Sequence, residues 1–274
     1  MQRGTEVTLS FPPFSGMVKR LVLINAAIYL LTLLLKVSSS PLLDRLMLIF
    51  GLVPSQVLSG RIWQLVTYSF LHADLLHLLY NMLVLWMFGA QLESAWGRRR
   101  FLQLYFVSLT GAAVITVLMA LAGVLVRMHT PTIGASGAAY GILAAFAALY
   151  GERRIIVFPL PLPLKAKHWV VFLVFVSLIG VVEGGGGVAH VAHLAGLLFG
   201  YLYVVFVVRR GAGASFSEGF FGLRNAYYRW KRRRTAKKFE VYMQQFEKQP
   251  EEEPDSASLP PGKKNGEHRG PWIN

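Results

Sequence analysis

The sequence predicts an all-α polytopic membrane protein, on the strength of its composition and of the length of its apolar runs. Of the 274 residues, 54% are hydrophobic and only 15% are charged, which is too apolar for an ordinary soluble domain. Six runs can cross a hydrocarbon core about 30 Å thick, which takes about 20 residues. They lie near residues 19–36, 71–92, 101–127, 136–151, 167–183 and 189–208, the fourth being short and rich in Gly and Ala.

Basic residues mark alternate loops between these runs, as the positive-inside bias requires. The basic positions are Lys19 and Arg20, Arg98 to Arg100, Arg153 and Arg154 with Lys165 and Lys167, and Arg209 and Arg210. We therefore expect both termini to be cytoplasmic and residues 37–70, 128–135 and 184–188 to lie on the outer side. The expected location is the inner membrane of a bacterial cell.

Two of the outer segments have distinctive compositions. Residues 46–53 are apolar but are followed by Pro54 and Gly60 and are too short to span, so we expect a first external loop that lies in or on the membrane. Residues 184–187 are four consecutive glycines. They fit either a plain flexible connection or a mobile cover over a site.

Three domains are expected: a cytoplasmic segment at 1–16, a six-helix membrane domain at 17–210, and a tail at 211–274. Residues 1–14 lack the uninterrupted apolar run of a cleavable signal peptide, so the first helix is expected to be retained. In the tail, residues 221–248 mix aromatic and basic side chains, as a helix against anionic lipid would, and residues 250–274 resemble disordered chain.

Charge and cysteine content exclude several classes of function. Half of the 28 Lys and Arg residues follow Val208, so the net charge of +14 reflects a membrane protein and its tail, and no nucleic-acid binding is expected. The chain has no cysteine, which excludes disulfides, thiolate metal sites and a cysteine nucleophile. We expect no cofactor and no metal.

Polar side chains inside apolar spans are costly and are therefore candidates for a site. On the second span His77 and Asn81 share a helix face, and His72 lies near its start. The fourth span opens with Gly134-Ala135-Ser136-Gly137 and carries Tyr140 one turn after the serine.

The sixth span carries His190 and His193, followed by Gly196 and Gly200. The fourth span has Gly137 and Gly141 at the same spacing of four, and small residues spaced in this way let two helices pack with their backbones close. If these two spans meet along the glycines, Ser136 faces His193. All the polar positions then lie at similar depth near the outer ends of their helices.

This combination suits acyl transfer. A histidine beside a serine can take its proton during attack on a carbonyl, and His77, Asn81 and the backbone N–H of Ser136 could stabilise the oxyanion. Neither Asp74 nor Glu183 is well placed to complete a triad, so the sequence predicts a Ser136–His193 dyad, with Tyr140 packed against the imidazole ring.

Residues 17–208 resemble the rhomboid family of intramembrane serine proteases. Ser136 with Gly134, Gly137 and Tyr140 is similar to the nucleophile motif of the family, and His193 with Gly196 and Gly200 is similar to the histidine motif of its sixth helix. His72, His77 and Asn81 match the polar positions of the second helix. Glu93 matches a structural acid, whereas Gln64 stands after Trp63 where the family often has arginine. The resemblance implies a serine endopeptidase that acts in the lipid bilayer and cuts transmembrane segments of membrane proteins near their outer ends.

Other interpretations compete with this one. A lone serine in a Gly-Ala helix is usually a packing residue, and His190 with His193 could suggest a metal pair, although no third ligand is evident. A catalytically dead rhomboid-like scaffold would typically lack the serine or the histidine. A transporter would need repeats or paired broken helices, which the sequence does not show. The physiological substrate and the oligomeric state are not encoded in any pattern of the sequence.

Overall fold

Helices make up most of the chain in the computed structural model, which describes residues 11–38, 40–157, 160–182, 187–209, 228–232 and 236. Residues up to Ser215 form one compact unit and residues from Phe216 onward form another. In the second unit, residues 228–232 are helical and exposed. The rest of the expected tail helix and most of the four-glycine loop lie outside the described residues.

Three helical segments in the described residues are long and apolar enough to cross a membrane: Gly16–Val37, Leu75–Leu121 and Ala189–Arg209. Two shorter apolar helices, Ser136–Tyr150 and Ala166–Val181, accompany them. In order, these segments comprise α1 (Gly16–Val37), α5 (Leu75–Val84), η2 (Leu85–Gly89), α6 (Ala90–Leu121), α7 (Ser136–Tyr150), α8 (Ala166–Val182), α9 (Gly187–Tyr203) and η3 (Val204–Arg209). The prediction of a helical membrane protein is confirmed, and the count of six spans stays a prediction.

The 47-residue segment Leu75–Leu121 is not one straight helix. At about 1.5 Å per residue it would be about 70 Å long, more than twice the thickness of a hydrocarbon core. Gly97 interrupts it with φ 79° and ψ 163°, a conformation that only glycine adopts readily. The segment ends earlier than the predicted run at 101–127, because Gly123 and Leu125 take positive φ angles after Leu121.

The start of α1 is fixed by a carboxylate from a distant helix. Glu93 accepts hydrogen bonds from the backbone N–H of Met17 at 2.7 and 3.0 Å and from that of Val18 at 2.9 Å. These N–H groups have no partner within their own helix. The carboxylate fits because Gly16 has no side chain: a Cβ there would lie 2.5 Å from Glu93 Oε1. The structural role expected for Glu93 is thus visible as a helix cap.

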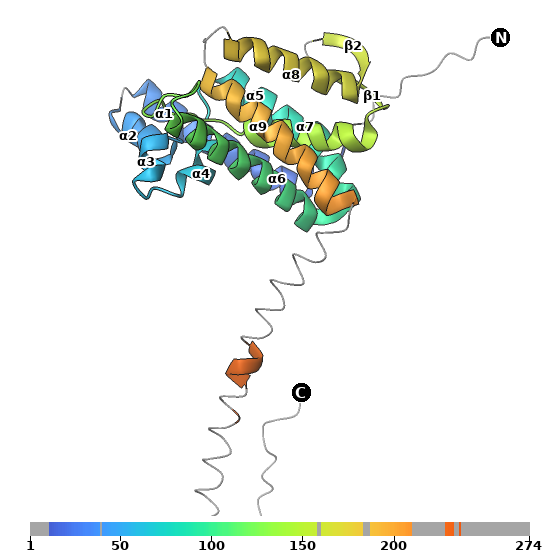
Figure 1. The fold of residues 1–274 in the computed structure, drawn as a ribbon, viewed down its shortest axis with the longest axis horizontal. Helices are drawn as coiled ribbons and strands as arrows, with labels where there is room; N and C mark the ends of the chain where they lie inside the picture. Colours follow the sequence, from blue (N-terminus) through green and yellow to red (C-terminus); the bar gives the residue numbers. More distant parts are fainter. Residues whose placement is uncertain are drawn as a thin grey trace, which may run out of the picture. The chain divides into compact units, whose positions relative to one another are not determined.

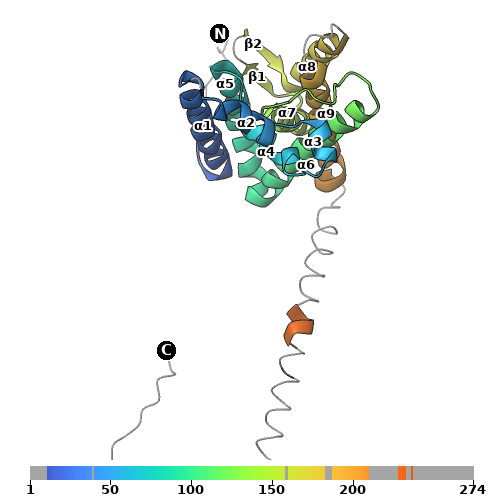
Figure 2. The same ribbon diagram turned by 90° about the vertical axis from the view of Figure 1, so that its left-hand side faces the viewer.

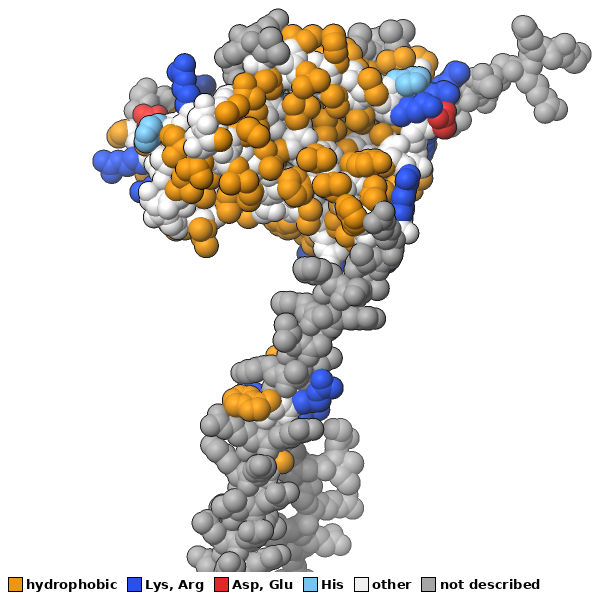
Figure 3. Space-filling model, viewed as in Figure 1, with side chains coloured by type: hydrophobic (Ala, Val, Ile, Leu, Met, Phe, Trp, Pro, Cys, Tyr) orange, Lys and Arg blue, Asp and Glu red, His pale blue; other side chains and the backbone are white. Residues whose placement is uncertain are grey.

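Helices α6, α7 and α9 form the most extensively packed part of the first unit. Figure 2 shows α7 at the centre of the helices, and Figure 1 shows α9 running along it. Most α7 side chains are buried, including Ala138, Ile142 and Phe146. Hydrophobic side chains cover much of the face in Figure 3, with Lys and Arg at its margins. Exposed leucines such as Leu34 and Leu118 agree with lipid as the solvent.

The segment between α1 and α5 folds into α2 (Leu42–Phe50), α3 (Pro54–Leu58), α4 (Gln64–Thr67) and η1 (Tyr68–Phe70). Gln64 is fully buried at its centre. Its Oε1 accepts the Val53 N–H at 3.0 Å, and its Nε2 donates to the carbonyl oxygens of Leu48 and Ile49 at 2.9 and 3.2 Å. The residue that departs from the family pattern therefore holds this loop together. Its position in or on the membrane stays a prediction.

A short antiparallel hairpin between α7 and α8 was not part of the all-α prediction. Strands β1 (Arg154–Val157) and β2 (Leu160–Lys165) pair with Arg154 opposite Lys165. The prolines at alternate positions of β2 argue against a strand in the sequence, because proline removes a hydrogen-bond donor and is tolerated only at sheet edges. The hairpin was therefore not predicted. The membrane helices are unaffected by this correction.

Candidate active site

The backbones of α7 and α9 touch along the glycines that the sequence singled out. A Cβ on Gly196 would lie 3.0 Å from the Cα of Gly137, and one on Gly200 would lie 2.5 Å from the Cα of Gly141. Real Cβ atoms do not approach a backbone this closely without a shift, so both contacts require glycine. The predicted close packing of these two helices is confirmed.

This packing brings the chain next to Ser136 close to the chain next to His193. The position of a Cβ on Gly137, the residue after Ser136, is 3.8 Å from the carbonyl oxygen of Ala192, the residue before His193. One turn below Ser136, Tyr140 stacks on the His193 ring with centroids 4.1 Å apart and planes 10° apart. The expected contact between Tyr140 and the imidazole is present. Ser136 itself is the first residue of α7, where backbone N–H groups have no partner in the helix.

His77 and Asn81 of α5 lie against the backbone that precedes Ser136. Gly134 has φ +116°, and a Cβ on it would lie 2.5 Å from Nε2 of His77 and 3.8 Å from Nδ2 of Asn81. Asn81 is buried, and its Nδ2 has no acceptor among the described residues. Two side-chain nitrogen atoms thus lie beside Gly134, two residues before the serine.

His72 supports this arrangement from outside the helix. It is buried and meets the His77 ring edge to face, with centroids 5.0 Å apart. Asp74 instead caps α5, because its side chain accepts the backbone N–H of His77 at 2.8 Å. Within the described residues, the side-chain hydrogen bond of Asp74 is therefore a helix cap. Glu183 lies outside the described residues.

Backbone hydrogen bonds hold the loop that leads to Ser136. Leu52 and Thr132 pair through two bonds of 2.9 Å, and the Gly134 N–H donates to the Tyr68 carbonyl at 2.9 Å. The Tyr68 hydroxyl in turn donates to the carbonyl of Leu109 on α6 at 3.0 Å. Sequence reasoning missed Tyr68, because its partners lie 41 and 66 positions away and leave no local pattern.

His190 packs differently from His193. Its ring lies against the backbone of Gly180 on α8 and meets His193 edge to face at 5.9 Å. Within the described residues, no group of three His, Cys, Asp or Glu side chains could hold a metal ion. The geometry gives His190 a place between α8 and α9.

Proteins with similar sequences come from several eukaryotes. Rhomboid protein 1, mitochondrial, of Saccharomyces cerevisiae is 34% identical over 137 residues, which are 49% of this chain and 39% of that protein. The human presenilin-associated rhomboid-like protein, mitochondrial, is 31% identical over 140 residues, 50% of this chain and 36% of that protein. Rhomboid-like protease 3 of Toxoplasma gondii is 29% identical over 178 residues, 65% of this chain and 64% of that protein. The matches span less than two fifths of the mitochondrial relatives.

These relatives correct the expected location. We expected the inner membrane of a bacterial cell. Similar proteins of yeast, zebrafish and human are mitochondrial. A bacterial origin is therefore not supported, and that prediction is wrong. The physical reason is that the distribution of Lys and Arg among loops predicts only the orientation of a chain in its membrane. It carries no signal for which membrane that is.

A family comparison covers more than half of the chain. The Rhomboid domain matches residues 59–210, a range that contains α5, α7 and α9 and every candidate residue described above. Members of this family are generally intramembrane serine proteases, and they act on membrane-protein substrates in the bilayer. This chain belongs to the rhomboid family.

Proposed function

We propose that the chain is an intramembrane serine endopeptidase that cleaves transmembrane segments of other membrane proteins. The observation that carries the proposal is the contact between α7 and α9, where Tyr140 stacks on His193 one turn from Ser136. Both members of the dyad are present in a chain of this family, whereas an inactive scaffold would not need to keep them. The helix glycines at the contact make the approach possible.

The proposed reaction starts with attack of the Ser136 oxygen on the carbonyl carbon of the scissile peptide bond, while His193 takes the hydroxyl proton. His77, Asn81 and the N–H of Ser136 stabilise the negative oxygen that forms. His193 then gives its proton to the leaving amine, and an acyl-enzyme remains. A water molecule attacks the ester, again with His193 as base, and releases the carboxylate and the free serine.

The unpaired donor of Asn81 supports its oxyanion role. A buried amide that lacks an acceptor costs stability, typically about 1–3 kcal/mol. Such a group suits a site in which the acceptor, the oxyanion of the substrate, forms only during the reaction. The donor is then already in position when the negative charge develops on that oxygen. His77 lies beside the same glycine and is the natural second donor.

We further propose six membrane crossings, with Leu75–Leu121 counted as two. The break at Gly97 and the three arginines that follow it support a turn at the membrane surface. On this proposal the membrane domain covers residues 17–210, between a short segment at 1–16 and a separate tail at 211–274. The loop with α2, α3 and α4 lies in the membrane surface, as the exposed Leu48, Ile49 and Phe50 favour.

The test is cleavage of a synthetic transmembrane substrate by the purified chain in detergent. Ser136→Ala and His193→Ala are each expected to abolish cleavage without unfolding the protein, and a fluorophosphonate probe should label the wild type but not Ser136→Ala. His190→Ala is the matched control, since it removes a histidine from the same helix outside the dyad, and it should retain activity. Near-normal turnover in either dyad variant would remove the proposed mechanism.

A further inference from the structure

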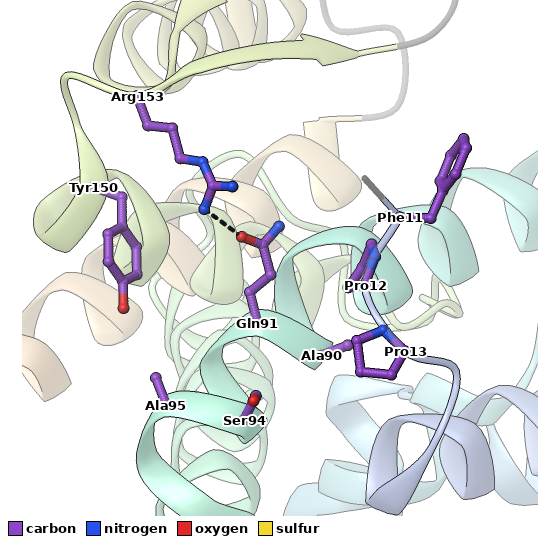
Figure 4. A pocket seen from close by; sticks show the side chains of 9 residues that line it. All are labelled: Phe11, Pro12, Pro13, Ala90, Gln91, Ser94, Ala95, Tyr150 and Arg153. Atoms are coloured by element: carbon purple, nitrogen blue, oxygen red, sulfur yellow. Dashed lines mark hydrogen bonds between the residues drawn. The ribbon is translucent and has the colours of Figure 1, made fainter. Parts of the chain in front are cut away.

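A second site candidate lies at the other end of α7. A cavity of about 350 Å³ opens between the segment before α1, the start of α6 and the end of α7. Its lining residues are Phe11, Pro12, Pro13, Ala90, Gln91, Ser94, Ala95, Tyr150 and Arg153 (Figure 4). Tyr150 is 14 residues from Ser136, about 21 Å along the helix, so the cavity is separate from the proposed active site.

Among the described residues that line it, the cavity carries one positive charge and no negative one. In the described part of the chain, Arg153 is the one lining side chain that is charged at neutral pH, and it makes no ion pair there. Figure 4 shows its guanidinium reaching toward the neutral Gln91, whose Oε1 accepts a hydrogen bond at 2.7 Å. Arginine has five N–H donors, so several stay available for a ligand.

Nearby carboxylates do not neutralise Arg153. Glu152 accepts hydrogen bonds from Lys165 at 2.7 Å and from Lys167, and these two bonds hold the pKa of its carboxyl at about 2. Glu93 is bound to the first backbone N–H groups of α1. The cavity is therefore a preformed hollow with an uncompensated cation, and an anionic ligand fits it.

One wall of the cavity is held in place without a ligand. Phe11 stacks on Trp86 of η2 with ring centroids 5.8 Å apart, and the Trp86 indole N–H donates to the Pro12 carbonyl at 3.1 Å. Pro12 is buried by these contacts. A wall fixed in advance lowers the entropic cost of binding.

The position of the cavity identifies the class of anion. The apolar helix α7 ends at Tyr150, and charged residues begin at Glu152, so the cavity lies where hydrocarbon meets the polar surface of a membrane. Phosphates of lipids lie at this level, and basic pockets between membrane helices bind such headgroups. The volume is at the lower end of the range for small-molecule pockets, about 300–1,000 Å³, which suits one headgroup.

We propose that this cavity binds the phosphate of an anionic phospholipid headgroup, with Arg153 as its main ligand and with the Ser94 hydroxyl and Gln91 amide beside it. The guanidinium fork matches two phosphate oxygens at once. The acyl chains lie along the apolar helix surface outside the cavity. This site is independent of the dyad and its test does not depend on proteolysis.

The test uses the full-length chain in a neutral detergent, with phosphatidylglycerol, phosphatidylcholine of the same acyl chains, or inorganic phosphate added. Bound lipid is measured by native mass spectrometry and protection by the shift in Tm. Phosphatidylglycerol is expected to bind and to raise Tm more than the other two. Arg153→Gln should weaken its binding about 10- to 100-fold, as loss of a hydrogen bond to a charged group predicts.

Arg154→Gln is the matched control, because it removes the same charge from the next residue, which does not line the cavity. It should change lipid affinity less than about twofold on the scale of a screened surface charge. Ala95→Leu fills the cavity without altering its charge and should also weaken binding, which keeps the proposal testable if Arg153→Gln does not fold. Equal losses in the two arginine variants, equal binding of the two lipids, or equal protection by inorganic phosphate would each overturn the assignment.

Discussion

Replacement of Gln64 by alanine should destabilise the loop between α1 and α5. Through that loop it should also destabilise the segment that leads to Ser136. The side chain of Gln64 is fully buried and joins three backbone groups of that loop. The loop is tied to the segment before the nucleophile by the Leu52–Thr132 pair. Loss of Gln64 therefore disturbs the Leu52 side of this pair, since Val53 is the next residue.

The magnitude follows from the groups left without partners. The Val53 N–H is buried, and an unsatisfied buried donor costs about 1–3 kcal/mol. The carbonyl oxygens of Leu48 and Ile49 are only partly buried, so water can replace the amide there and the further cost is smaller. A total of about 2–4 kcal/mol is expected, which corresponds to a decrease in Tm of about 4–16 °C for a chain of this size.

Thermal unfolding in detergent measures this loss, with Gln56→Ala as the control. Gln56 accepts hydrogen bonds from Gln64 and Arg61 but contacts none of the three backbone groups, so its removal should cost less than about 1 kcal/mol. Gln64→Arg should recover only part of the loss, because arginine can donate to the two carbonyls but cannot accept the Val53 N–H. Unchanged Tm in Gln64→Ala would refute the reasoning.

Three further predictions concern the helices. Asn81→Ala should lower turnover of a transmembrane substrate about 10- to 1000-fold with little change in Tm, and a large fall in Tm with full activity would end the oxyanion proposal. Gly196→Ala pushes a methyl group into the Gly137 backbone and should cost about 1–3 kcal/mol in thermal unfolding, so wild-type stability would contradict the close approach. Glu93→Gln removes the charge from the α1 cap and should speed amide exchange at Met17 and Val18, measured by hydrogen exchange, and unchanged exchange would argue against the cap.

The parts of the fold that could be predicted leave a short-range pattern in the sequence. Glycines spaced by four residues predict close helix packing, and a tyrosine four residues after Ser136 lies on the face of that serine. Both patterns correspond to contacts in the structure, between Gly137 and Gly196 and between Tyr140 and His193. The composition of the spans was enough to predict a helical membrane protein.

The parts that could not be predicted depend on partners far away in the chain. The contact of Glu93 with the first N–H groups of α1 joins residues 76 and 75 positions apart, and the Tyr68 hydroxyl bonds a carbonyl 41 positions away. In the sequence, Gln64 is only a departure from a motif. Its structural role depends on the backbone groups that it bonds, and these are known only from the fold. The cavity at Arg153 arises where three distant segments meet, so no local pattern in the sequence predicts it.

The two ends of α7 differ in how their polar groups are satisfied, and this difference separates their roles. At the Ser136 end the loop backbone is tied by hydrogen bonds, yet the donor of Asn81 and Nδ1 of His193 find no partner among the described residues. At the Arg153 end the polar groups are partly exposed, and the one cation of the cavity already has a neutral partner. Unpaired buried donors on a rigid backbone are costly in the resting protein, so they favour chemistry that supplies an acceptor transiently. An accessible cation in a preformed hollow favours a ligand that stays bound, and the lipid site should therefore affect stability while the dyad affects turnover.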